Sequence, residues 1–372
     1  MQTREATVID LPRMVEELPP EEKKLFHRIF RVQAVTGQLR PMPEMEGWIL
    51  DTFGPLEGVK DQRIVRVTNE ITLEGTLFNR LRANRPVSAK ERLGALAQVI
   101  DESIRIPEPL DNPLTKTPED TFGRVRGRYC VSAANIAKYD GLHAMIVIEG
   151  EHNPLAVSWE HFDDMMDVAR RWLEAAHRAD PQARYPFFLW NCLWRAGATL
   201  IHTHSQVMLG RGQHYAKVEA LRRAALTYKK EHGSDYFQDL YRVHDALGLA
   251  FSRDDCHLLA HLTPIKEKEV VFLAPRIDGC LKKLIFDALA CYRGALRAVS
   301  FNLAVFGPPL APTEEDWNGF PIVARLVDRG DLTSRASDMG TMELYAQSVV
   351  STDPFQVARA MFKVCGMSGS ES

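Results

Sequence analysis

Two histidines one residue apart, followed at the same spacing by a glutamine, form the stretch of this chain best suited to chemistry. The segment AGATLIHTHSQVMLG, residues 196–210, places His202, His204 and Gln206 at every second position. Residues at this spacing point to one face of a strand, so the pattern predicts three polar side chains in line on a buried strand.

The residues alone leave three interpretations of this stretch open. The first is a structural pair of histidines whose ring nitrogens are satisfied by hydrogen bonds. The second is a metal site, because H-x-H on a strand is a common ligand pair, although the apolar residues 207–209 follow where a further acidic ligand would be expected. The third is nucleophilic catalysis, in which one imidazole attacks an α-phosphorus while neighbouring groups hold the phosphate oxygens.

Composition and charge limit the partners that the chain can have. Of its 372 residues, 45% are hydrophobic, which is enough to bury a substantial core. There are 46 Lys and Arg against 49 Asp and Glu, a net charge of −3, so no global basic field would hold a nucleic acid. No apolar run approaches the about 20 residues of a membrane span, and the N-terminus lacks a signal-peptide core. We therefore expect no membrane or nucleic-acid partner.

The six cysteines are scattered and contain no C-x-x-C pair. This usage is typical of a reducing compartment and argues against a zinc site built from cysteines. Together with the absence of an apolar leader, it predicts a soluble, cytoplasmic protein.

Alternating strand and helix patterns surround the histidines. Residues 129–209 predict strand, strand, helix, strand and strand, and residues 256–328 predict the same order. Two β-β-α-β-β halves suggest an internal duplication. Val323 and Arg325 stand in the second half where the first half has its histidines, so only the first half would keep the reactive pair.

The residues before the first half predict a separate region. We expect a helix from about Pro12 to Thr36, a strand over residues 63–71, and a helix from about Ala89 to Ile104. A Pro-rich connector, IPEPLDNPLTKTPED, follows over residues 106–120. The predicted division is an N-terminal helical region with a basic arm (1–120), a first half with the H-x-H-x-Q site (121–235), and a degenerate second half (236–372).

The stretch FFLWNCLWRAGATLIHTHSQVMLG resembles the active-site segment of the galactose-1-phosphate uridylyltransferase branch of the histidine-triad (HIT) superfamily. In that segment an asparagine precedes a glycine-serine turn and then H-P-H-x-Q. The matching positions are Asn191, Gly197, Thr199, His202, His204 and Gln206, with Thr199 for serine and Thr203 for proline. The resemblance implies an α+β fold of two HIT-like β-β-α-β-β halves in a galactose-1-phosphate uridylyltransferase-like arrangement, with an extra N-terminal helical region.

Three further stretches resemble the family in the same order along the chain. FNRLRANRP resembles its N-terminal arm, which implies Arg82 and Arg85 as phosphate clamps. SAANIAKYDG falls at the nucleoside-binding segment, which implies a ribose or base contact by Asn135. SDMGTMELY resembles the segment that reaches the hexose, which implies a sugar contact by Glu343. Taken alone, the basic stretch also fits a solvated loop, and Glu343 an ordinary surface acid.

The resemblance also implies a mechanism and its partners. His204 would attack the α-phosphorus of a nucleoside diphosphate compound, and phosphate or a sugar phosphate would then discharge the histidyl-nucleotide. His202 would orient the site, Gln206 and Thr199 would donate to phosphate oxygens, and Asn191 would hold the backbone or a phosphate. The partners would be a small-molecule nucleotide donor and an anionic acceptor. Relatives act on NDP-sugars, dinucleoside polyphosphates or adenylyl sulfate, so the base, the sugar and the acceptor stay open.

The metal sites of the family are not expected here. Members with structural metals use a C-x-x-C pair and additional histidines, whereas this chain keeps only His152 and has Val323 and Arg325 in its second half. We therefore expect no metal and no other cofactor. Two other functions stay open, namely a non-catalytic nucleotide-binding protein of this fold and a metal-dependent hydrolase that uses His202, His204 and His152. The oligomeric state, a homodimer included, is not fixed by the sequence.

Overall fold

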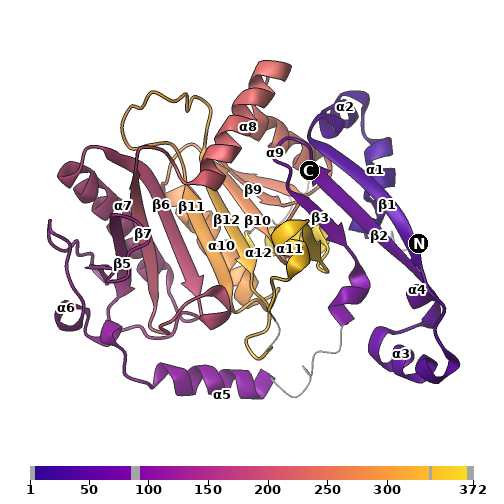
Figure 1. Ribbon diagram of the computed structural model, residues 1–372, viewed down its shortest axis with the longest axis horizontal. Coiled ribbons are helices and arrows are strands. Elements are labelled where there is room, and N and C mark those ends of the chain that lie inside the picture. Colours follow the sequence, from indigo (N-terminus) through magenta and orange to yellow (C-terminus); the bar gives the residue numbers. More distant parts are fainter. Residues whose placement is uncertain (1–4, 85–92, 335–336, 367–372) are drawn as a thin grey trace.

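A nine-stranded sheet forms the frame of the molecule (Figure 1). The computed structural model describes residues 5–84, 93–334 and 337–366. All neighbouring strands of the large sheet are antiparallel. In sheet order they are β4 (Cys130–Ala134), β5 (Leu142–Ile148), β7 (His204–Arg211), β6 (Ala183–Cys192), β11 (Phe301–Phe306), β12 (Ile322–Asp328), β10 (Val270–Ala274), β9 (Cys256–Ala260) and β8 (Ala250–Arg253).

The sheet consists of two similar halves. The first runs β4, β5, α7 (Trp159–Ala179), β6, β7, and the second runs β9, β10, α10 (Gly279–Arg293), β11, β12. In space β4-β5-β7-β6 is followed by its mirror order, β11-β12-β10-β9, so the halves join through β6 and β11. The predicted pair of β-β-α-β-β halves is confirmed, while the boundaries at residues 120 and 235 stay a prediction.

Helices α7 and α10 cover one face of this sheet. α7 packs across β4, β5, β6 and β7, α10 packs on β9 and β10, and the two helices contact each other. The apolar face of α7 follows helical spacing, with Phe162, Met165, Ala169 and Trp172 all buried. Its first turn is capped by Ser158, whose Oγ accepts the His161 N–H. None of the helices in the described ranges is long and apolar enough to cross a membrane.

The N-terminal region contains a second, four-stranded sheet as well as helices. Helices α1 (Leu11–Glu17) and α2 (Pro20–Ile29) form as expected, but the helix predicted to reach Thr36 ends at Ile29. Residues Phe30–Gln38 instead form β1, because their β-branched side chains favour a strand and β2 (Asp61–Asn69) offers a pairing partner. The sheet order is β1-β2-β3-β13, with β3 at Gly75–Phe78 and β13 at Ser348–Val350.

The remaining elements lie around these sheets. The helix predicted to start near Ala89 is α5; residues 85–92 lie outside the described ranges. The other helices are α3 (Glu46–Phe53), α4 (Leu56–Lys60), α6 (Pro113–Lys116), α8 (Ala216–His232), α9 (Tyr236–Ala246), α11 (Thr341–Tyr345) and α12 (Pro354–Val364), and α5 itself spans Leu93–Ile104.

A half-buried ion-pair network connects the small sheet to the large one. Arg325 on β12 donates from Nη1 to Glu74 Oε1 at 2.6 Å and from Nε to Glu269 Oε1 at 2.6 Å. Burial alone would raise the pKa of Glu74, but the charges and hydrogen bonds of Arg325 and His261 together outweigh it and hold that pKa well below its usual range. The arginine that replaces the second histidine pair therefore has a structural role.

His244 on α9 is a buried neutral histidine whose two ring nitrogens are both bonded. Nδ1–H donates to the Leu240 carbonyl at 2.8 Å, and Nε2 accepts the Leu262 N–H at 3.2 Å. Burial lowers its pKa to about 3, and the neighbouring His261 adds to the effect. The folded state therefore excludes a proton that the unfolded chain takes up below its ordinary pKa of 6.5.

We expect the free energy of unfolding to fall as the pH drops below about 6.5, because the unfolded state then binds the extra proton. One such histidine accounts for a loss of about 2 kcal/mol between pH 7 and pH 5. His244→Asn should be less stable at pH 7 but show a shallower pH dependence in urea unfolding. Exposed His27→Asn is the control and should leave the slope unchanged; equal slopes for His244→Asn and the wild type would contradict this origin.

Candidate functional site

A tight connection between β6 and β7 presents the histidines. After β6 the chain makes a short 3₁₀ turn, Trp194–Ala196, and then passes through Gly197 at φ +94°, a conformation that favours glycine. Strand β7 begins only at His204, so His202 precedes the strand. The predicted common face therefore applies to His204 and Gln206, whereas His202 is placed by separate contacts.

His204 is a buried imidazole with a defined tautomer. Its Nδ1 lies 2.8 Å from the backbone carbonyl of His202, and because a carbonyl only accepts, Nδ1 carries the proton. The lone pair is therefore on Nε2. Burial lowers the pKa of His204 below its ordinary value, so the ring is neutral near pH 7. A neutral ring with a free Nε2 lone pair is the form that can act as a nucleophile.

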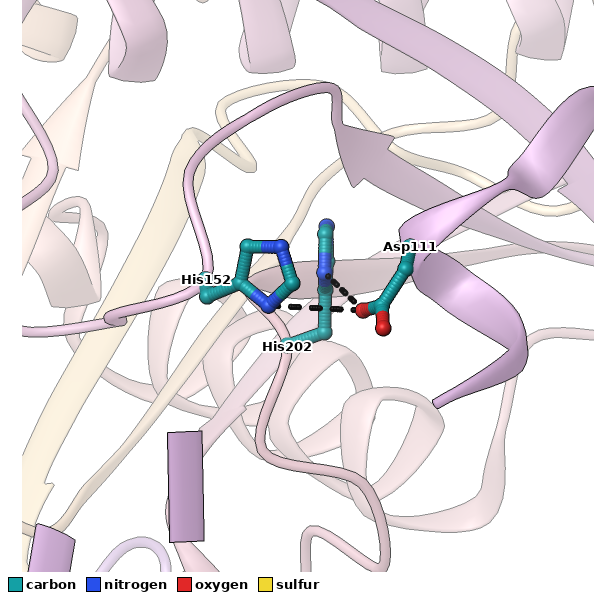
Figure 2. A group of neighbouring side chains, drawn as sticks. All are labelled: Asp111, His152 and His202. Atoms are coloured by element: carbon teal, nitrogen blue, oxygen red, sulfur yellow. Dashed lines mark hydrogen bonds and ion pairs between the residues drawn. The ribbon is translucent and has the colours of Figure 1, made fainter. Parts of the chain in front are cut away.

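His202 is held by groups from two distant segments. Its Nε2–H donates to the Ile148 carbonyl at the end of β5, at 2.8 Å. Its Nδ1 faces Asp111 Oδ1 at 3.1 Å, and His152 Nδ1 faces the same oxygen at 3.3 Å (Figure 2). The carboxylate of Glu108 accepts the backbone N–H groups of Ile201 and His202, each at 2.9 Å. The Pro-rich connector therefore fixes the backbone just before His204.

Asp111, His152 and His202 bring three possible ligand atoms within 4.8 Å of one another. Figure 2 shows the three side chains grouped around the Asp111 carboxylate. Two imidazoles and a carboxylate fit the ligand preferences of zinc and related divalent ions. His204 is not part of this group, so the set of three histidines considered for a hydrolase is not assembled in the described part of the chain. The expectation of no bound metal stays a prediction, and Asp111 was not foreseen.

Gln206 is oriented by a histidine that the sequence did not reveal. His143 on β5 accepts the Tyr139 N–H at Nδ1 (3.0 Å), so its Nε2 carries the proton and donates to Gln206 Oε1 at 2.8 Å. The amide oxygen is thereby occupied, which leaves the Gln206 NH₂ as the donor. Burial lowers the pKa of His143 and keeps it neutral. The Asn135 amide lies 3.4 Å from the same Nε2, so the proposed nucleoside residue joins this cluster.

Asn191 belongs to a polar chain that crosses the junction of the two halves. Its Oδ1 accepts from Asn302 Nδ2 at 2.7 Å, and the two residues are paired directly in the β6–β11 ladder. Asn302 Oδ1 in turn accepts from Arg329 Nη1 at 2.6 Å, and Arg329 forms a bidentate ion pair with Asp338. The second half thus supports the first through Asn302 and Arg329.

A cavity of about 520 Å³ brings together residues from the two ends of the chain. It is lined by Arg82 from the 3₁₀ turn after β3 and by Glu343 from α11, together with the cations Arg195, Lys266 and Arg329. Glu343 Oε2 accepts the Gly340 N–H at 2.9 Å, which fixes its carboxylate.

Two further residues were predicted, Thr199 and Arg85. Thr199 is exposed in the turn before β7. Arg85 lies outside the described residues. The sequence prediction missed Asn302, although the internal duplication could have revealed it, because an asparagine stands on the corresponding strand of each half. No sequence pattern marks His143 or Asp111, since their roles depend on long-range contacts.

Comparison with known proteins identifies the fold. No family model and no curated protein matches the sequence. An ADP-glucose phosphorylase structure from Arabidopsis thaliana, with bound ADP-glucose, matches with a TM-score of 0.58 and 16% identity, over 79% of this chain and 96% of that chain. A GalT-like protein from the same organism matches with a TM-score of 0.57 and 15% identity, over 69% of this chain and 92% of that chain. A uridylyltransferase matches with a TM-score of 0.53 and 14% identity, over 72% of this chain and 96% of that chain. The chain therefore has the galactose-1-phosphate uridylyltransferase-like HIT fold that the sequence resemblance predicted.

Glu108→Gln tests how the backbone before His204 is held. The amide keeps one oxygen acceptor but brings its NH₂ toward a backbone N–H, so we expect a loss of roughly 1–3 kcal/mol in the free energy of unfolding. Urea unfolding measures the loss, and Glu119→Gln, an exposed acid in the same connector, is the matched control. Equal stabilities of the two variants would show that the Glu108 contacts contribute nothing.

Proposed function

We propose that the protein is a nucleotidyltransferase or nucleotide phosphorylase that works through a histidyl-nucleotide on His204. The observation that carries this proposal is the hydrogen bond from His204 Nδ1 to the His202 carbonyl. It leaves the Nε2 lone pair of a neutral, buried ring free to attack an electrophile. The order of Asn191, the glycine turn and H-x-H-x-Q on this fold supports phosphorus as that electrophile.

The proposed reaction has two displacements at the α-phosphorus. In the first, His204 Nε2 forms a bond to phosphorus as the bond to the bridging oxygen breaks, and the remainder of the donor leaves as an anion. In the second, an oxygen of phosphate or a sugar phosphate attacks the same phosphorus and releases His204. The NH₂ of Gln206 and the hydroxyl of Thr199 would donate to the non-bridging oxygens, and Arg82 would balance their charge.

The cavity between Arg82 and Glu343 is the proposed place for the leaving group and the acceptor. Its lining combines four cations with five carboxylates, and Asp338 among these already pairs with Arg329. The cations Arg82, Arg195 and Lys266 would contact phosphate, and the carboxylate of Glu343 suits sugar hydroxyls. NDP-sugars therefore fit the lining well, and a dinucleoside polyphosphate is the other donor class considered. The ADP-glucose bound in the Arabidopsis structure of similar fold supports the first class.

The group formed by Asp111, His152 and His202 would position the nucleophile. A divalent cation bound there would supply a fixed positive charge that holds the His202 ring. His202 itself acts through its backbone carbonyl, which orients His204. Asp111 and Ile148 hold the His202 ring from its two nitrogens, so rotation of that ring is opposed on both sides.

Of the described residues, neither Gln206 nor His143 can supply a proton to a basic leaving group. Gln206 has no titratable proton, and the Nε2–H of His143 is already donated to Gln206. The lowered pKa of His143 also keeps it from gaining a second proton near pH 7. Leaving groups that depart as stable anions are therefore favoured, and phosphoramidates should react poorly.

His204→Asn should lower turnover by several orders of magnitude, because the nucleophile is lost while asparagine still fills the space. The affinity for nucleotide should change by less than about tenfold, as measured by calorimetry with ADP. His177→Asn on α7, outside the site, is the control. Turnover above about a tenth of the wild-type value would remove His204 from this role, and nucleotide binding without turnover in the wild type would favour the non-catalytic alternative.

A covalent adduct should accumulate when donor is present without acceptor. Incubation with α-³²P-labelled ADP-glucose or diadenosine tetraphosphate should label the protein, and the label should be acid-labile, base-stable and absent from His204→Asn. Adding phosphate or glucose 1-phosphate should discharge it, because Gln206 is not a base and the Nδ1 lone pair of His143 already accepts the Tyr139 N–H, so neither residue activates water. Release of nucleoside monophosphate at the same rate with and without acceptor would instead identify a hydrolase.

A further inference from the structure

Two free thiols meet where the β8–β9 hairpin approaches the start of α10. Arg253 and Cys256 are paired across the hairpin, so residues 254 and 255 form its turn and Asp255 precedes Cys256 directly. Cys280 lies in the first turn of α10, where the Asp278 side chain accepts its N–H at 3.0 Å. The Cys280 thiol donates to the Arg253 carbonyl at 3.2 Å, which brings the helix against the hairpin.

The ligand atoms of Asp255, Cys256 and Cys280 all lie within 4.8 Å of one another. Around one tetrahedral zinc ion, with Zn–S near 2.3 Å and Zn–O near 2.1 Å, ligand atoms lie roughly 3.5–4 Å apart. A small inward movement of side chains on a hairpin turn and a helix end is therefore enough to close a shared shell. We propose that these three residues form a binding site for a thiophilic divalent cation of the zinc type.

Two carboxylates flank the thiols. Asp255 precedes Cys256 directly, and the Asp278 side chain accepts the Cys280 N–H at 3.0 Å. The same carboxylates attract a divalent ion, which displaces both thiol protons as it binds. Arg276 bonds to Asp255 at 3.3 Å and to Asp278 at 2.8 Å, so it is the cation that a metal would partly replace.

The proposed site is separate from the histidine cluster. Successive antiparallel pairings from β7 to β9 make these two strands run in opposite directions. His204 begins β7 and Cys256 begins β9, so the two lie at opposite ends of the sheet's strands. A cation held by Cys256 and Cys280 would tie the edge hairpin to α10, which is a structural role independent of phosphorus chemistry.

The test is a titration of the reduced, full-length protein with Co²⁺, which reports thiolate ligands by a sulfur-to-metal charge-transfer band in the near ultraviolet. We expect one such site per chain and release of about two protons per ion. Cys256→Ser and Cys280→Ser should abolish the band, and Asp255→Asn, an exposed turn variant, should weaken binding at least about tenfold. Arg276→Gln should bind Co²⁺ more tightly because the competing cation is gone.

Two control variants separate this site from others. Cys365→Ser, a buried thiol in the same half, should keep the band, and His202→Asn should keep it because the Asp111 group contains no sulfur. Circular dichroism verifies that each variant is folded. The proposal is overturned if the folded wild type shows no thiolate band, if the band survives Asp255→Asn and both cysteine variants, or if mild oxidation joins Cys256 to Cys280 while Co²⁺ gives no protection.

Discussion

The hydrogen bond from His204 Nδ1 to the His202 carbonyl is the interaction on which the site depends. It places the proton on one ring nitrogen and leaves the other with its lone pair. The carbonyl can do this only if its own residue is fixed. Glu108 holds the backbone on one side of it, and Asp111 and the Ile148 carbonyl hold the His202 ring. The orientation of this one peptide group therefore depends on contacts from the loop itself, from the end of β5 and from the Pro-rich connector.

The two halves share one sheet but have diverged in chemistry. The first half keeps a histidine pair at the start of β7, whereas the second has Arg325 bonded to Glu74 and Glu269. This half-buried arginine contacts a carboxylate beside each sheet, so its guanidinium is used in contacts between the sheets. The second half instead contributes Asn302 and Arg329, which support Asn191 across the junction. One half is proposed to do the chemistry while the other supplies supporting contacts.

Much of this architecture follows from the sequence, and the exceptions have physical causes. Strand and helix periodicity revealed both halves, and the fixed offsets from Asn191 to Gln206 identified the central segment. His143 and Asp111 were missed because hydrogen bonds across β5 and from the connector depend on register and chain path, which local patterns do not encode. The strand Phe30–Gln38 was mistaken for helix because pairing with β2, a tertiary contact, decided its conformation. The roles proposed for Arg82, Asn135, Thr199 and Glu343 still rest on the resemblance, and Arg85 lies outside the described residues.

The parallel pairing of β13 with β3 has a consequence for how the protein is made. Ser348–Val350 completes a sheet whose other strands are translated nearly three hundred residues earlier, since β3 is Gly75–Phe78. On the ribosome, His204 emerges long before that strand. Glu343, which lines the cavity opposite Arg82, is translated only with the last part of the chain. A growing chain would thus contain the histidine pair before it contains the residues that complete this cavity.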